Sequence, residues 1–113
     1  MEEIRLKPIG RIHSPLKRYD DVPVQPKFSD VEGTIEVLKE YEEGLKDLDG
    51  FEYIICLAYL HEVRQPVPLQ STTHWDDVKH GVFAIRTPRR PNPIGFSVLK
   101  LLKVEGNLLD VKN

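Results

Sequence analysis

The sequence predicts a small all-β protein, a single-sheet antiparallel β-barrel with a short helical turn and long loops. Residues 33–38 alternate apolar and polar side chains, and residues 51–60 form a longer run rich in β-branched and aromatic residues. Clusters of proline and glycine separate these runs. With 113 residues, 40% of them apolar, the chain is long enough for one modest core. We therefore expect one domain over residues 1–113.

The first half of the chain is expected to hold two strands and a turn. Apolar residues over 4–12 suggest an extended segment, and the proline-rich stretch 13–31 is expected to be a loop. Residues 33–38 form the next predicted strand. Residues 41–50 resemble a short helical turn that ends at Gly50.

The second half is expected to be mostly strand. The strongest strand prediction is 51–60, and the polar residues 62–79 are expected to form a loop. Residues 81–86 alternate as in another strand. The apolar positions of 96–104 fit helical spacing as well as a buried strand, and the flanking glycines Gly95 and Gly106 favour strand. A last short strand is expected over 108–111.

Composition and charge exclude several classes of protein. The net charge of −2 means that any nucleic acid must bind to a local basic patch. The single Cys56 cannot form an internal disulfide, and we interpret it as a buried thiol in a reducing compartment. There is no apolar run of membrane-spanning length and no signal-peptide pattern, so we expect a cytoplasmic protein.

The segment from 81 to 97, which begins as the predicted strand and breaks into a stiff loop, is the main candidate for function. Three prolines stiffen it and three arginines, Arg86, Arg89 and Arg90, are presented on it. Gly95 permits a close backbone approach or a positive φ. A stiff basic loop between strands loses little entropy when an anionic ligand binds. Two alternatives are a solvated connection and, over 88–91, a polyproline ligand for an SH3-type partner.

Other candidate residues lie in two further segments. His61 follows the run 51–60 and is a candidate to face a ligand, the alternative being a histidine at the rim of the sheet. Gln25 has an amide that could recognise a base edge or an amino-acid head group. No histidine has metal-like spacing with Cys56, so we expect no zinc site. A possible RNA-facing patch consists of Lys17, Arg18, Lys27, Arg89 and Arg90.

Four segments together resemble the TsaA-like family, also called TrmO. The most specific is Gly-Val-Phe-Ala-Ile-Arg-Thr-Pro-Arg-Arg-Pro-Asn-Pro-Ile-Gly-Phe-Ser over 81–97. The others are Ile-Gly-Arg-Ile-His-Ser-Pro over 9–15, the stretch 33–51, and the run that ends in His61. The resemblance implies a homodimeric single-sheet barrel that uses S-adenosylmethionine (SAM). It would methylate N6 of threonylcarbamoyladenosine next to the anticodon of tRNA, with no DNA or membrane partner.

The resemblance also implies roles for particular residues. The SAM contacts would be Pro23, Val24, Gln25, His61, Glu62, Arg86 and Phe96. The family often has a basic residue where Val24 stands, so only a backbone contact is expected there. His61 is also the candidate general base, because imidazole changes charge near neutral pH.

The family continues beyond the position of Asn113 into an Asp-Gly-Thr-Pro segment and a closing segment. We therefore expect residues 1–113 to lack part of the cofactor pocket and of the barrel closure. Two other hypotheses remain open: a SAM- or nucleotide-binding module without catalysis, and an interaction domain that uses the Pro-Arg-Arg-Pro segment.

Overall fold

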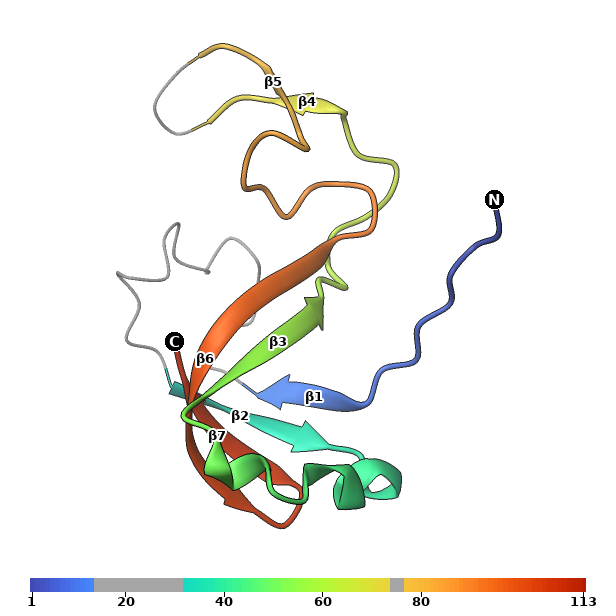
Figure 1. Cartoon of the computed structure of the whole chain (residues 1–113). Helices are drawn as coiled ribbons and strands as arrows, with labels where there is room; N and C mark the ends of the chain where they lie inside the picture. The colour runs from blue at the N-terminus through green and yellow to red at the C-terminus, as the bar shows by residue number, and fades with distance from the viewer. Residues whose placement is uncertain (14–31, 74–76) are drawn as a thin grey trace.

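The main element of the structure is a curled five-stranded antiparallel sheet, which resembles half of a barrel (Figure 1). The structure, a computed structural model, describes residues 1–13, 32–73 and 77–113. The strand order is β1-β2-β7-β6-β3. The strands are β1 (Gly10–His13), β2 (Glu32–Val37), β3 (Tyr53–Tyr59), β6 (Ile94–Glu105) and β7 (Leu108–Lys112). The predicted all-β class is confirmed.

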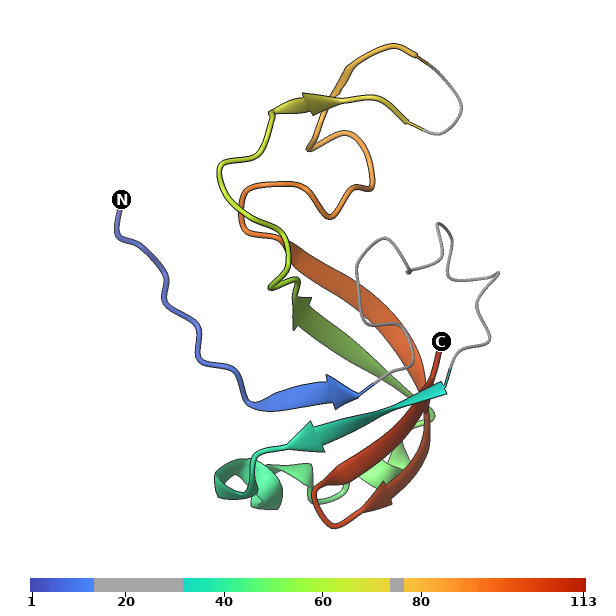
Figure 2. The same ribbon diagram turned by 180° about the vertical axis from the view of Figure 1, so that it is seen from behind.

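Two short 3-10 helices form the predicted helical turn. They are η3 (Lys39–Leu45) and η4 (Leu48–Gly50), and they lie at the end of the sheet near the β6–β7 turn (Figure 2). Leu45 and Leu48 pack against the buried core, which is contributed by the central strands. That core consists of Val37, Leu101, Leu109 and Val111. Burial of these aliphatic side chains holds the two helices against the sheet.

Segment 96–104, whose apolar spacing fitted a helix as well as a strand, is part of β6. The strand favoured by the flanking glycines Gly95 and Gly106 is therefore confirmed. A β-bulge between Leu101 and Lys103 interrupts the pairing with β7. A bulge inserts one extra residue into a strand and so shifts the alternation of side chains by one position. As a result Leu99, Leu101 and Val104 all reach the core. This shift explains why the apolar spacing imitates a helix.

A two-residue turn joins β6 to β7. Gly106 occupies its first position with φ 60°, a left-handed conformation that favours glycine. Asn107 ties this turn to the end of β2. Its side-chain Nδ2 donates to the Val37 carbonyl at 2.8 Å, and its own carbonyl accepts the Val37 N–H at 2.9 Å.

Three local predictions were wrong. Residues 81–86 do not form a strand: only β5 (His80–Gly81) is extended, paired with β4 (Gln70–Ser71), and the chain then turns. Of the extended segment over 4–12, residues 10–12 belong to β1, the Ile9 carbonyl accepts the Leu38 N–H at 2.8 Å, and the chain before Ile9 leaves the sheet (Figure 1). Gly95 lies inside β6 without a positive φ or a close backbone approach.

The outer face of β3 and β6 is apolar and exposed. Directly paired residues are Ile55 with Val98, Leu57 with Phe96, and Tyr59 with Ile94. Leu57 is 67% exposed and Phe96 is 59% exposed. A contiguous apolar surface of this kind marks an interaction site on most soluble proteins. We call these six residues the outer apolar face.

Gly10 is a position at which a side chain has no room. A Cβ atom there would lie 2.5 Å from the Glu36 carbonyl oxygen and 3.1 Å from the Val37 Cα. Because the neighbour is backbone, β1 must move away from β2. We therefore expect Gly10→Ala to lower the free energy of unfolding by about 1–3 kcal/mol in urea denaturation.

The matched control for this substitution is Gly95→Ala. The nearest atoms to a Cβ at Gly95 are the Leu60 Cδ2 at 3.7 Å and the Ala58 carbonyl oxygen at 3.8 Å, which is ordinary contact. Gly95→Ala should leave the denaturation midpoint nearly unchanged. Equal effects of the two substitutions would contradict the close approach of β1 to β2.

Candidate functional site

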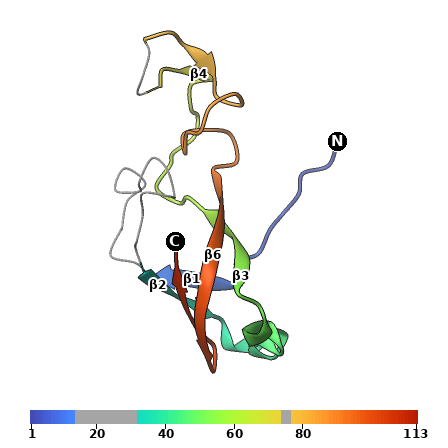
Figure 3. The same cartoon turned by 60° about the vertical axis from the view of Figure 1, so that its left-hand side comes forward.

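Two chain segments meet at one end of the β3–β6 pair. β3 and β6 run side by side toward this end in both Figure 1 and Figure 3. The Leu60 N–H donates to the Pro93 carbonyl at 2.8 Å, which ties the end of β3 to the start of β6. His61 and Glu62 then form an exposed turn, closed by the Val63 N–H donating to the Leu60 carbonyl at 3.1 Å.

The segment 82–93, which we call the arginine loop, returns the chain from β5 to β6. It begins at Val82, which is 1% exposed. The Arg90 guanidinium closes the loop from inside: its Nη2 donates to the carbonyls of Val82 at 2.7 Å and Ile85 at 2.6 Å, and its Nε donates to the Thr87 carbonyl at 3.0 Å. The loop is therefore compact although it contains no strand.

The end of the arginine loop is fixed by its backbone. Asn92 has φ 54°, a left-handed conformation that asparagine adopts more readily than most residues. Its carbonyl accepts the Ile94 N–H at 2.7 Å, and the following Pro93 is buried. The Pro-Asn-Pro sequence thus turns the chain directly into β6.

Arg86 and Arg89 differ from Arg90 in their surroundings. Both are exposed, whereas Arg90 is half-buried. Among the residues that the structure describes, the guanidinium groups of Arg86 and Arg89 form no hydrogen bond or ion pair. The Arg89 backbone N–H donates to the Thr87 Oγ1 at 3.2 Å, which holds the main chain there. The loop thus presents two cations to solvent and uses the third for its own folding.

The remaining predicted site residues are placed as follows. Phe96 is the third residue of β6 after the loop, and it belongs to the outer apolar face. His61, Glu62, Arg86 and Phe96 therefore come from adjoining elements at one end of the sheet. The predicted residues Pro23, Val24, Gln25, Lys17, Arg18 and Lys27 lie outside the described residues.

Gln65 is a residue of this region that the sequence did not single out. Its Nε2 donates to the Arg90 carbonyl at 3.0 Å and so links the segment after Glu62 to the arginine loop. No local pattern signals this bond, since the two residues are 25 positions apart. Only the pairing of β3 with β6 brings them together.

Cys56 lies on the inner face of β3 and is half-buried. Burial raises the pKa of its thiol above the ordinary value, so the neutral form is favoured near neutral pH. A neutral thiol is a poor nucleophile and a poor metal ligand. Within 1–13, 32–73 and 77–113, no three histidine, cysteine or acidic residues cluster so as to hold a metal ion.

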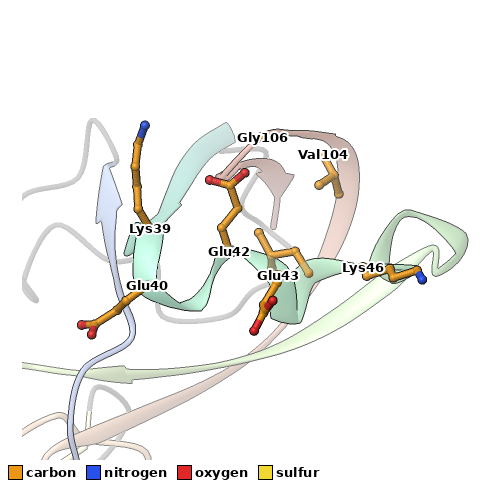
Figure 4. A pocket seen from close by; sticks show the side chains of 8 residues that line it. Lys39, Glu40, Glu42, Glu43, Lys46, Val104 and Gly106 are labelled. Atoms are coloured by element: carbon orange, nitrogen blue, oxygen red, sulfur yellow. The ribbon is translucent and has the colours of Figure 1, made fainter.

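A shallow concavity lies at the other end of the sheet, between η3 and the β6–β7 turn (Figure 4). Its rim contains Glu40, Glu42 and Glu43 together with Lys39 and Lys46. Figure 4 shows Lys39, Glu40 and Glu43 pointing in different directions. An acidic rim with diverging side chains is unsuited to an anionic ligand, so the candidate site remains at the arginine loop.

The geometry defines a class of protein: a small antiparallel half-barrel with a basic, internally bonded loop at the end of one strand pair. Residues 11–113 match the family model of the tRNA-methyltransferase O N-terminal domain. The chain belongs to this family, as the resemblance of its motifs implied.

Individual relatives extend the comparison. The chain is 45% identical over 108 residues to a probable S-adenosyl-L-methionine-binding protein of Pyrococcus abyssi, with 95% of this chain and 58% of that protein covered. It is 28% identical over 110 residues to the tRNA (adenine(37)-N6)-methyltransferase of Escherichia coli, covering 92% of this chain and 47% of the enzyme.

A solved structure agrees in fold. The crystal structure of TrmO from Pseudomonas aeruginosa superposes with a TM-score of 0.74 at 30% sequence identity, covering 98% of this chain and 49% of that one. The chain therefore spans about half the length of these relatives. In the described residues, no helix is long and apolar enough to cross a membrane.

Proposed function

We propose that this chain is the SAM-binding part of a cytoplasmic tRNA methyltransferase that acts on N6 of the threonylcarbamoyl-modified adenosine next to the anticodon. The observation that carries the proposal is the arginine loop, held beside the His61–Glu62 turn with two of its arginines free among the described residues. Family membership and the names of the relatives support the same conclusion.

The residues of the site fit this cofactor. SAM supplies a methyl group on a positively charged sulfur, and an amino-acid carboxylate by which it can be anchored. The Arg86 guanidinium is suited to a carboxylate, because its planar fork donates two parallel hydrogen bonds. It serves either the carboxylate of SAM or the threonyl carboxylate of the substrate. The Phe96 ring provides an aromatic surface for a purine.

His61 is the proposed acceptor of the N6 proton. The attacking nitrogen shares its lone pair with the purine ring and the carbamoyl group, so loss of its proton makes it a better nucleophile. A well-placed base contributes roughly 10²–10⁴-fold. His61 is exposed at the end of β3 and has no hydrogen-bond partner among the described residues, so its ring nitrogens are available.

The test of the proposal is methyl transfer from labelled SAM to tRNA, with and without the threonylcarbamoyl group. We expect transfer to modified tRNA only. Calorimetry with SAM separates the alternatives: binding without transfer would favour a SAM-binding module, the activity for which the Pyrococcus relative is named. No binding of SAM at all would favour the interaction domain.

We further propose that Arg89 contacts a phosphate of the anticodon loop, as part of a patch with Lys17, Arg18 and Lys27. Arg89→Gln should flatten the slope of log affinity for tRNA against log salt by about 0.7–0.9, the effect of one phosphate contact. SAM affinity should be unchanged. Fluorescence anisotropy at several salt concentrations measures the slope.

The control for Arg89 is Lys46→Gln, which removes an exposed cation from the acidic concavity at the other end of the sheet. Its salt slope should equal that of the unsubstituted protein. If both substitutions flatten the slope equally, the chain attracts tRNA by its overall charge and Arg89 has no special role.

The outer apolar face supports a proposal about assembly: two copies of the chain pair through it as a homodimer. A two-fold interface uses the same patch on both copies, so it needs a surface that is complementary to itself. An apolar face without charged residues at its centre satisfies this condition, because no like charges meet across the axis.

A further inference from the structure

The Arg90 side chain uses its Nη2 and Nε donors inside the protein. Its Nη2 and Nε bond to the carbonyls of Val82, Ile85 and Thr87, all at 3.0 Å or less. A guanidinium has five N–H donors in a fixed plane, so one side chain can satisfy several carbonyls that no strand partner reaches. A cation donating to carbonyls also forms stronger bonds than a neutral donor. Arg90 therefore substitutes for secondary structure in this loop.

The backbone of Arg90 extends the linkage to the second half of the site. Its carbonyl accepts the bond from Gln65 Nε2 at 3.0 Å, and its N–H donates to the Pro88 carbonyl at 3.0 Å. Gln65 follows the His61–Glu62 turn by three positions. A single residue thus connects the segment that presents Arg86 with the segment that presents His61.

We propose that Arg90 is a positioning residue, which holds Arg86 and the His61–Glu62 turn in register for ligand binding rather than contacting tRNA itself. This inference rests on the proposed function for the ligand, but the folding of the loop by Arg90 does not. It revises the expected RNA patch. Arg89 remains a proposed phosphate contact, whereas Arg90 leaves the patch and takes a structural role.

Arg90→Lys is the decisive variant, with Arg90→Gln beside it. Lysine keeps the charge but lacks the planar fork, so it would rescue a phosphate contact and fail to rescue a positioning role. Arg90 lies outside the core formed by Val37, Leu101, Leu109 and Val111, so both variants should fold. Circular dichroism checks this point.

Three measurements follow for each variant. Amide hydrogen exchange of the SAM-free protein should quicken at least about tenfold over 82–89, the effect of losing one charge-assisted bond. SAM affinity by calorimetry should fall by about the same factor. The salt slope for tRNA should stay the same, whereas Arg89→Gln should reduce it and leave exchange unchanged.

The outcomes separate the two proposals. The positioning role is overturned if exchange over 82–89 is unaltered in both Arg90 variants. It is also overturned if Arg90→Lys has full tRNA affinity while Arg90→Gln lowers the salt slope. If the unsubstituted protein does not bind SAM, the proposed function fails, and the exchange data still decide whether Arg90 holds the loop. Gln65→Met gives a second probe: faster exchange around Arg90 supports the linkage, and unchanged exchange contradicts it.

Discussion

Arg86→Ala is expected to weaken SAM binding by more than about tenfold, since a charge-assisted hydrogen bond typically contributes 1.5–3 kcal/mol. The guanidinium of Arg86 is exposed on a loop whose backbone is fixed by other residues, and it has no partner among the described residues. Removing it should leave the loop folded and take away only the ligand contact. Calorimetry with SAM measures the loss, and circular dichroism should remain unchanged.

Two further variants sharpen this prediction. Arg86→Lys retains the charge but lacks the planar fork of the guanidinium. Its SAM affinity should therefore lie between those of the unsubstituted protein and Arg86→Ala. Arg11→Ala, which removes an exposed arginine from β1 at the opposite end of the strand order, should bind SAM normally. If Arg86→Ala binds SAM normally but loses affinity for threonylcarbamoylated tRNA, the guanidinium serves the substrate carboxylate instead.

The sequence predicted those parts of the fold that depend on local pattern. The strand run 51–60 became β3 because its alternation matches a two-sided sheet, with Cys56 inward and Leu57 outward. The helical turn was also predicted from local sequence, by the glycine that ends it, and its apolar residues Tyr41, Leu45 and Leu48 pack against one core. These features need no knowledge of distant residues.

The arginine loop could not be predicted in the same way. Residues 81–86 alternate as a strand does. In a strand, the carbonyls of Val82 and Ile85 would accept hydrogen bonds from neighbouring strands. Here the Arg90 guanidinium donates hydrogen bonds to these two carbonyls, so the chain can turn without a strand partner. A hydrogen-bonding side chain several positions away overrides the local pattern, and only its placement in space reveals it.

The sequence proposes candidate site residues one by one, but it does not give their arrangement. The motifs make Arg86 and His61 candidates, and the pairing of β3 with β6 places their segments at one end of the sheet. The distinction between Arg89 and Arg90 could not be made from sequence, because both are arginines in the same proline-rich stretch. Arg89 is exposed and Arg90 is half-buried, and this difference is the basis for proposing a ligand contact for Arg89 and a structural role for Arg90.

Leu57→Asp is expected to abolish self-association while each copy stays folded. Leu57 lies at the centre of the outer apolar face, opposite Phe96, and is 67% exposed in the single chain. In a two-fold dimer both copies lose a buried leucine, and each buried leucine contributes about 1.5–3 kcal/mol. The dissociation constant of the dimer should therefore rise by more than about a hundredfold.

Sedimentation equilibrium over a range of concentrations measures this change, and Leu6→Asp is the matched control. Leu6 is 75% exposed but belongs to residues 1–9, outside the sheet, so the same chemical change there should leave the dimer intact. A monomer at every concentration for the unsubstituted protein would refute pairing through this face. In that case the outer apolar face would be available to bind the additional sequence that the longer relatives have. A version extended to their length should then show Phe96 and Leu57 protected in solvent-labelling experiments.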